Sequence, residues 1–150
     1  MKQNIDHLKI SEKLEALSAV VSKVDDAKFN MRCWLYSRKP DVTLGELMSV
    51  DAHECGTWAC ALGAAALAFE GLVLHRQDRI GSGQHVILFE DAYGFASKGY
   101  PAAAKFFGIT HREAVEIFSP WAYCQAPVPP KEAVVERIGV VAEQYRARGL

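Results

Sequence analysis

Three residues whose side chains could perform nucleophilic catalysis follow one another along the chain: Cys55, His85 and Asp91. Cys55 lies just before the stretch from Thr57 to Glu70, for which we predict a helix, and a thiol near a helix N-terminus can have a lowered pKa. His85 begins a predicted strand and could act as a general base, with Asp91 beyond that strand to orient its imidazole. Such a set is what a cysteine-dependent hydrolase or transferase needs.

A metal site would need several histidine and cysteine side chains to converge. His53, Cys55 and Cys60 are close in sequence, and they could supply three ligands. Either Cys33 or His75 could complete the set. Structural zinc usually pairs ligands two to four residues apart, whereas four residues separate Cys55 from Cys60. We therefore predict no metal and no cofactor.

Residues 103–118 have the small-residue spacing of a helix-turn-helix, in which alanine is followed by a glycine turn and a second helix with an apolar face. The second helix would contact DNA bases, but it carries Glu113 and Glu116 against Arg112 alone. The net charge of −1, with acidic and basic residues interspersed, provides no basic surface either. DNA contact through residues 103–118 is an alternative, and a nucleic-acid partner is not expected.

Aromatic side chains gather in predicted loops and at predicted helix ends rather than in helical stripes. Tryptophan and tyrosine combine a large apolar area with a polar group, which suits ligand pockets and interfaces. Loops are also where binding sites concentrate. The candidate binding residues are Trp34, Tyr36, Trp58, Tyr93, Trp121 and Tyr123, with Tyr100 in the same group.

The predicted helix from Thr57 to Glu70 is the element around which the chain must fold, because no charged side chain lies between Glu54 and Glu70. A helix that is apolar on every side is a buried helix. Thr57 is its expected N-cap. Gly63 in its middle costs stability relative to alanine, so we expect another backbone to approach closely there.

Periodic apolar residues predict the other helices. They run from Ile10 to Val24, from Thr43 to Val50, from Tyr100 to Phe107, from Thr110 to Phe118 and from Pro130 to the C-terminus. Capping boxes at Thr43 and Thr110 indicate two of the helix starts. Residues 72–76 and 85–89 are rich in β-formers and flank a glycine-rich turn, which predicts one β-hairpin. This hairpin must pack on helices, since two strands alone are marginally stable.

The composition fits one domain, 1–150, because 150 residues that are 50% hydrophobic can build a full core. The N-terminus lacks a signal-peptide pattern, and the longest uncharged stretch is too short to span a bilayer. We therefore expect a cytoplasmic protein without membrane contact, whose four cysteines are thiols.

Several blocks of the chain resemble, in order and spacing, a family of uncharacterised proteins from bacteria and their phages. The blocks are Phe29-Asn30-Met31-Arg32-Cys33-Trp34, Cys55-Gly56-Thr57-Trp58-Ala59-Cys60-Ala61-Leu62-Gly63, Ala103-Ala104-Lys105-Phe106-Phe107-Gly108-Ile109-Thr110-His111-Arg112-Glu113-Ala114, and Phe118 with Pro120 and Tyr123. The Cys-Gly-Thr block is the most specific of them. That family has no assigned activity, so the resemblance implies a bacterial or phage accessory protein and carries over no catalytic residue.

The predicted fold is a single α+β domain, mainly α-helical, with one β-hairpin packed on a buried central helix. The leading hypothesis for its function is a small non-enzymatic binding or interaction protein, acting on a protein partner or a small ligand. The alternative is a cysteine-dependent hydrolase or transferase that uses Cys55 and His85. The order of cysteine, histidine and carboxylate is similar to that of papain-like and bacteriocin-processing peptidases. Those peptidases stabilise the oxyanion with an upstream glutamine, and only the remote Gln3 precedes Cys55.

Overall fold

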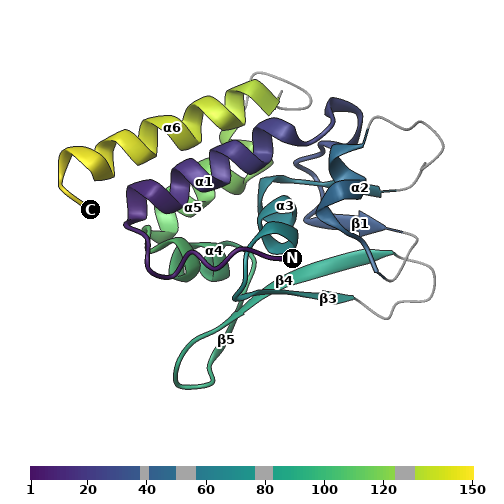
Figure 1. The fold of residues 1–150 in the computed structure, drawn as a ribbon, viewed down its shortest axis with the longest axis horizontal. Helices are drawn as coiled ribbons and strands as arrows, with labels where there is room; N and C mark the ends of the chain where they lie inside the picture. Colours follow the sequence, from purple (N-terminus) through teal and green to yellow (C-terminus); the bar gives the residue numbers. More distant parts are fainter. Residues whose placement is uncertain (38–40, 50–56, 77–82, 124–130) are drawn as a thin grey trace.

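The computed structural model describes residues 1–37, 41–49, 57–76, 83–123 and 131–150. These residues form an α+β fold, as predicted, in which helices cover a twisted sheet (Figure 1). The α-helices are α1 (Ile10–Lys23), α2 (Leu44–Met48), α3 (Ala61–Ala68), α4 (Tyr100–Phe107), α5 (His111–Phe118) and α6 (Lys131–Ala147), and the 3₁₀-helices are η1 (Asp26–Lys28) and η2 (Pro120–Tyr123). The strands are β1 (Leu35–Ser37), β2 (Thr57–Ala59), β3 (Leu72–Arg76), β4 (Gln84–Glu90) and β5 (Ala96–Lys98).

Helix α3 is the buried centre of the fold, and all eight of its residues are buried. It begins later than predicted, because Thr57–Ala59 pair with β1 as strand β2. Strand pairing satisfies the backbone groups of these residues, so Thr57 is not an N-cap. Cys60 takes that role, and its Sγ accepts the N–H of Gly63 at 3.4 Å.

Gly63 is where another backbone approaches α3, as predicted. A Cβ atom at this position would lie 1.8 Å from the carbonyl oxygen of Trp34. The same oxygen accepts the N–H of Cys60 at 3.1 Å. The absence of a side chain at Gly63 therefore lets the segment that carries Trp34 pack directly on the central helix.

The strands form one antiparallel sheet in the order β2-β1-β4-β3, with β5 paired to the C-terminal part of β4. The predicted hairpin is present as β3 and β4, with Leu72 opposite Phe89 and Arg76 opposite His85. The expectation of a single hairpin is not confirmed, because the sheet has five strands. The strands that were not predicted, β1, β2 and β5, have three residues each, which is too short for a recognisable alternation of apolar and polar side chains.

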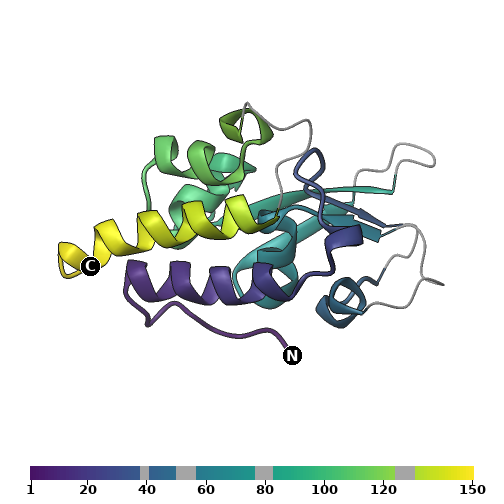
Figure 2. The same ribbon diagram turned by 90° about the horizontal axis from the view of Figure 1, so that it is seen from above.

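Helices α1 and α6 lie antiparallel and side by side on the outside of the helical layer (Figures 1 and 2). The hydroxyl of Ser11 in the first turn of α1 donates to the carbonyl of Leu150 at 2.6 Å. At the other end, Nζ of Lys131 in the first turn of α6 donates to the carbonyl of Val24 at 2.7 Å. Both ends of the helix pair are thereby fixed, and its apolar residues enter the core.

The two helix starts that were predicted from capping boxes are confirmed. Thr43 and Glu46 exchange hydrogen bonds at the start of α2, as Thr110 and Glu113 do at the start of α5. Gly108 follows α4 in the left-handed region, with φ at 77°. Within the described ranges, no helix combines the length and apolar character needed to cross a bilayer.

Candidate functional site

Two pairs of the predicted aromatic residues meet at the start of β1. Trp34 packs edge to face against Tyr100 of α4, with ring centroids 4.9 Å apart. Tyr36 lies directly opposite Trp58 in the β1–β2 pair, and their ring centroids are 5.0 Å apart. Trp58 remains 37% exposed. The sheet therefore brings together aromatic residues that are far apart in the sequence, as a binding site would require.

A cavity of about 310 Å³ opens beside Trp34, and we call it the aromatic cavity. Its aromatic walls are Trp34, Tyr100 and Trp121, and its polar side chains include Arg32 and Gln84. They come from four places in the chain: the turn before β1, the first residue of β4, the first residue of α4, and η2. Trp121 is 82% exposed, so one wall of the cavity is an aromatic face open to solvent.

The aromatic cavity is lined by both aromatic rings and polar groups. Its volume is at the lower end of the range for ligand pockets. The amide of Gln84 can both donate and accept hydrogen bonds, and Arg32 brings positive charge. Aromatic rings favour offset or edge-to-face partners, so the cavity suits a planar aromatic ligand.

His85 lies at the N-terminal end of β4 and is only 6% exposed. Leu35 of β1 and Arg76 of β3 are its direct neighbours across the sheet. Its Nδ1 atom is buried and has no hydrogen-bond partner among the described residues. Burial lowers the pKa of His85, and the positive charge of Arg76 lowers it further against the effect of nearby backbone groups of Gly83 and Leu35. The imidazole is therefore neutral at neutral pH.

The structure does not bring Asp91 to His85. They stand at opposite ends of β4, about 20 Å apart at the usual rise per residue of a strand. The Asp91 carboxylate accepts the backbone N–H groups of Tyr93 and Phe95 at 2.9 and 3.0 Å, and it lies 3.9 Å from Nζ of Lys105. Asp91 thus stabilises the β4–β5 turn and does not orient the imidazole.

The proposed nucleophile, Cys55, lies outside the described residues. Burial raises the pKa of Cys33 to about 11 and that of Cys60 to about 12. Both are therefore protonated thiols at neutral pH, and Cys60 serves as the cap of α3. Among the residues that the structure describes, no three histidine, cysteine or acidic side chains converge as metal ligands.

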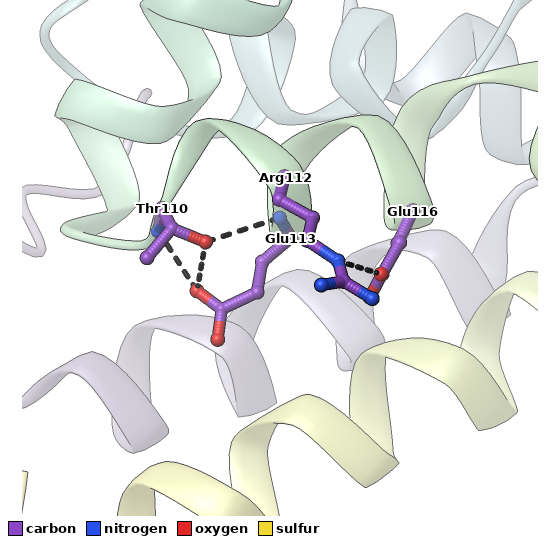
Figure 3. A network of polar contacts seen from close by, with 4 residues as sticks. All are labelled: Thr110, Arg112, Glu113 and Glu116. Atoms are coloured by element: carbon purple, nitrogen blue, oxygen red, sulfur yellow. Dashed lines mark hydrogen bonds and ion pairs between the residues drawn. The ribbon is translucent and has the colours of Figure 1, made fainter.

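The helix pair at residues 103–118 exists as α4 and α5, joined at Gly108. In α5, Glu113 caps the helix start through Thr110 and accepts the hydroxyl of Tyr145 at 2.6 Å. Arg112 is paired with Glu116 at 2.9 Å on the exposed side (Figure 3). The positive charge of Arg112 is therefore paired with Glu116, and Glu113 adds a further negative charge to α5. The surface of this helix offers little to phosphate groups.

Four of the predicted binding residues do not line the aromatic cavity: Tyr36 and Trp58, which face each other across β1 and β2, and Tyr93 and Tyr123. Tyr93 is 86% exposed on the β4–β5 turn, beside Phe95. Tyr123 donates its hydroxyl to the carbonyl of Ile117 at 2.8 Å, and the guanidinium of Arg137 lies 5.5 Å from its ring centroid. Burial raises the pKa of Tyr123, which supports a packing role for that side chain.

The sequence interpretation missed the polar side chains of the aromatic cavity, Arg32 and Gln84. Gln84 faces Tyr36 only because β1 pairs with β4, a contact between residues far apart in the chain. Arg32 precedes a three-residue strand with no periodic signal. Neither residue could be assigned to a site without knowledge of the β1–β4 pairing.

No known protein family model matches this chain, and comparisons with curated proteins and with solved structures give no significant match. Its function is therefore inferred from its own structure.

Proposed function

We propose that this chain is a small binding protein of bacterial or phage accessory type, and that it takes a small molecule with a planar aromatic body in the aromatic cavity. The observation that carries this proposal is the cavity of about 310 Å³ that has the rings of Trp34, Tyr100 and Trp121 in its lining. The resemblance of the sequence blocks to an accessory family is consistent with a binding role.

The aromatic walls of the cavity differ in how far they are exposed to solvent. Trp34 is fixed against Tyr100, and its ring also lies 3.2 Å from the position that a Cβ on Gly99 would occupy. Trp121 is largely exposed on η2. A planar ligand between these walls would remove the exposed face of Trp121 from water, and each Å² of apolar area removed contributes about 25 cal/mol. Gln84 would then hydrogen-bond to a polar substituent of the ligand.

The three tryptophans of the chain provide the test, because each has one indole N–H signal in a protein NMR spectrum. The probes are indole, indole-3-acetate and adenosine, which are planar and differ in charge and in hydrogen-bonding groups. We expect at least one of them to shift the Trp34 and Trp121 signals in a saturable way and to shift the Trp58 signal less. Trp58 does not line the cavity, so it reports on non-specific stacking.

Matched variants complete the experiment. Trp121→Ala should weaken binding of the active probe, while Trp58→Ala, which removes a tryptophan outside the cavity, should not. Equal shifts of all three indole signals, or equal loss of affinity in both variants, would contradict the proposal. An absence of any saturable shift across the three probes would also count against it.

A cysteine-dependent hydrolase or transferase is the second candidate, and one observation favours it. Nδ1 of His85 is buried without a partner, as a base awaiting another group would be. Alkylation near neutral pH separates the two functions, because the raised pKa values of Cys33 and Cys60 make both react slowly. If Cys55 labels much faster than these two residues, the enzyme is favoured. If it labels no faster, the binding function stands alone.

A further inference from the structure

A second cavity, of about 440 Å³, shares Leu35 and His85 with the lining of the aromatic cavity. Its polar lining consists of Lys2, Asp41, Thr43, Arg76 and His85, and we call it the basic cavity. Apolar side chains, among them Leu35, Leu67 and Leu74, form the rest of its wall. We propose that the basic cavity binds a small oxyanion, either a carboxylate or a phosphate group, through Arg76 and His85, with Lys2 adding positive charge to the cavity. This inference does not depend on the function proposed for the aromatic cavity.

The strand register places the two main groups on one face of the sheet. Arg76 and His85 are directly opposite each other in the β3–β4 pair, so their side chains project to the same side. Leu35 flanks His85 on β1 and is buried in the core. This is therefore the face that packs against α3, and Arg76 lies at its edge, where it reaches solvent.

Lys2 is held beside this face by the N-terminal segment. Gln3 forms backbone hydrogen bonds with Ala68 and Glu70, at 2.8 and 2.9 Å, which fixes the segment along the end of α3. Nζ of Lys2 donates to the carbonyl of Leu72 at 3.2 Å. Leu72 and Arg76 are the two ends of β3, about 13 Å apart at the usual rise of a strand, so Lys2 contributes its charge to the cavity rather than a contact shared with Arg76.

The observation that points to a ligand is the imidazole of His85. A buried polar atom without a partner costs stability, and native structures contain few of them. His85 is more than nine-tenths buried, and no other described residue supplies the missing partner for Nδ1. An oxyanion oxygen in the basic cavity would supply it when Nδ1 carries a proton, as it does in the imidazolium.

The charges of the basic cavity favour a negative ligand. Lys2 and Arg76 bring two positive charges and Asp41 brings one negative charge, while Glu70, outside the lining, interacts with Lys2. No ion pair of Arg76 occurs among the described residues, so its five N–H donors are available to an oxyanion. The hydroxyl of Thr43 accepts the N–H of Glu46 and retains its own proton to donate.

The experiment follows the imidazole of His85 by NMR while sodium phosphate or sodium acetate is added to the intact protein. Sodium chloride at matched ionic strength is the control, and the His85 signal is identified by its loss in His85→Gln. We expect a saturable shift with at least one oxyanion and a rise in the pKa of His85, because a bound anion favours the imidazolium. The groups that face this imidazole are Arg76, Lys2 and Asp41, so the titration is repeated in the variants below.

Two charge-matched variants decide the outcome. Arg76→Gln should weaken oxyanion binding by about tenfold, since it removes a charge-assisted hydrogen bond. Lys98→Gln removes the same charge from an exposed residue paired with Leu88 on the opposite face of the sheet, and it should have no effect. Saturation with phosphate alone would assign a phosphate group, and saturation with acetate would assign a carboxylate. Equal shifts with chloride, or equal weakening in the two variants, would overturn the proposal.

Discussion

The helical layer and the His85 end of the sheet differ in whether their buried polar atoms have hydrogen-bond partners. The His85 end is the place where Leu35, Arg76 and His85 lie side by side. In the helical layer Tyr145 donates to Glu113 at 2.6 Å and Ser11 donates to Leu150 at 2.6 Å. At the His85 end of the sheet, Nδ1 of His85 is the one buried side-chain N or O atom of the described residues that has no partner. The described buried polar groups of the helical layer thus have partners, whereas the sheet end keeps a group that costs stability and that the proposed ligand would satisfy.

Aromatic side chains show the same contrast. In the helices the large rings of Phe107 and Phe118 are fully buried and stack at a centroid distance of 6.0 Å. Trp58 and Trp121, which lie in β2 and η2, are exposed. The two regions therefore differ in how far they expose large rings to solvent, and of the two exposed tryptophans only Trp121 lines the aromatic cavity.

The largest effect is expected at Gly63, where the two regions meet. Gly63→Ala would place a methyl group against the carbonyl oxygen of Trp34, which forces β1 away from α3. We expect a loss of about 3 kcal/mol in the free energy of unfolding, measured by urea denaturation. The control is Gly139→Ala in α6, where a Cβ meets no atom within 4 Å. The free energy of unfolding of that variant should rise by up to about 1 kcal/mol. Similar changes in the two variants would contradict the close packing of the Trp34 backbone against Gly63.

A smaller loss is expected within the helical layer from Tyr145→Phe. This change removes the hydrogen bond to the Glu113 carboxylate and should cost about 1.5 kcal/mol at pH 7. Burial opposes the charge of Glu113, but hydrogen bonds from Tyr145 and Thr110 prevail and lower its pKa. A depressed carboxylate pKa stabilises the fold above the ordinary glutamate pKa, and this contribution is lost as pH falls through the depressed value.

The difference between Tyr145→Phe and the unmodified protein should therefore be largest at neutral pH and should shrink below about pH 4.3. Thermal unfolding across this pH range measures it. Tyr93→Phe is the control, because Tyr93 is exposed and should change stability by less than about 0.5 kcal/mol. A pH-independent difference would show that Glu113 is not the group that Tyr145 stabilises.

At the His85 end of the sheet we expect a substitution to leave the free energy of unfolding unchanged or to raise it. His85→Leu removes a buried atom without a partner while keeping a similar volume, so stability at pH 7 should stay equal or rise by about 1 kcal/mol. The lowered pKa of His85 means that the unfolded chain binds its proton first as pH falls. The unmodified protein should therefore lose stability below about pH 6.5, and His85→Leu should not show that loss.

The same change at exposed His75, His75→Leu, serves as the control and should shift stability at pH 7 by less than about 0.5 kcal/mol. A loss of more than 1 kcal/mol in His85→Leu would mean that the imidazole already has a partner in the folded protein, and the contrast between the two regions would fail.

The sequence predicted the helical layer well because its signals are local. The caps of Thr43 and Thr110 and the glycine at 108 each act within a few residues, and the structure confirms them. The start of α3 was misplaced because Thr57 also fits a helix cap, and only its pairing with β1 decides for a strand. Long-range pairing of this kind leaves no periodic pattern in three residues.

The candidate site was predicted in part, for the same reason. Trp34 and Trp121 were selected from their residue type and loop position, and they do line one cavity. His85 was selected as a base for Cys55, whereas its direct neighbours in the sheet are Leu35 and Arg76. Both neighbours are set by strand register, which the sequence alone does not reveal.

The smallest effect is expected at Arg112, on the exposed side of α5. Its ion pair with Glu116 spans one helical turn and is open to solvent, so Arg112→Ala should cost about 0.4 kcal/mol, and this cost should vanish near 1 M salt. Urea denaturation at low and high salt measures it. If α5 instead read DNA, Arg112→Ala would reduce binding to a duplex while leaving this small stability cost unchanged. Gel-shift titration of the unmodified protein and of Arg112→Ala with a random-sequence DNA duplex tests this possibility. We expect neither protein to bind the duplex.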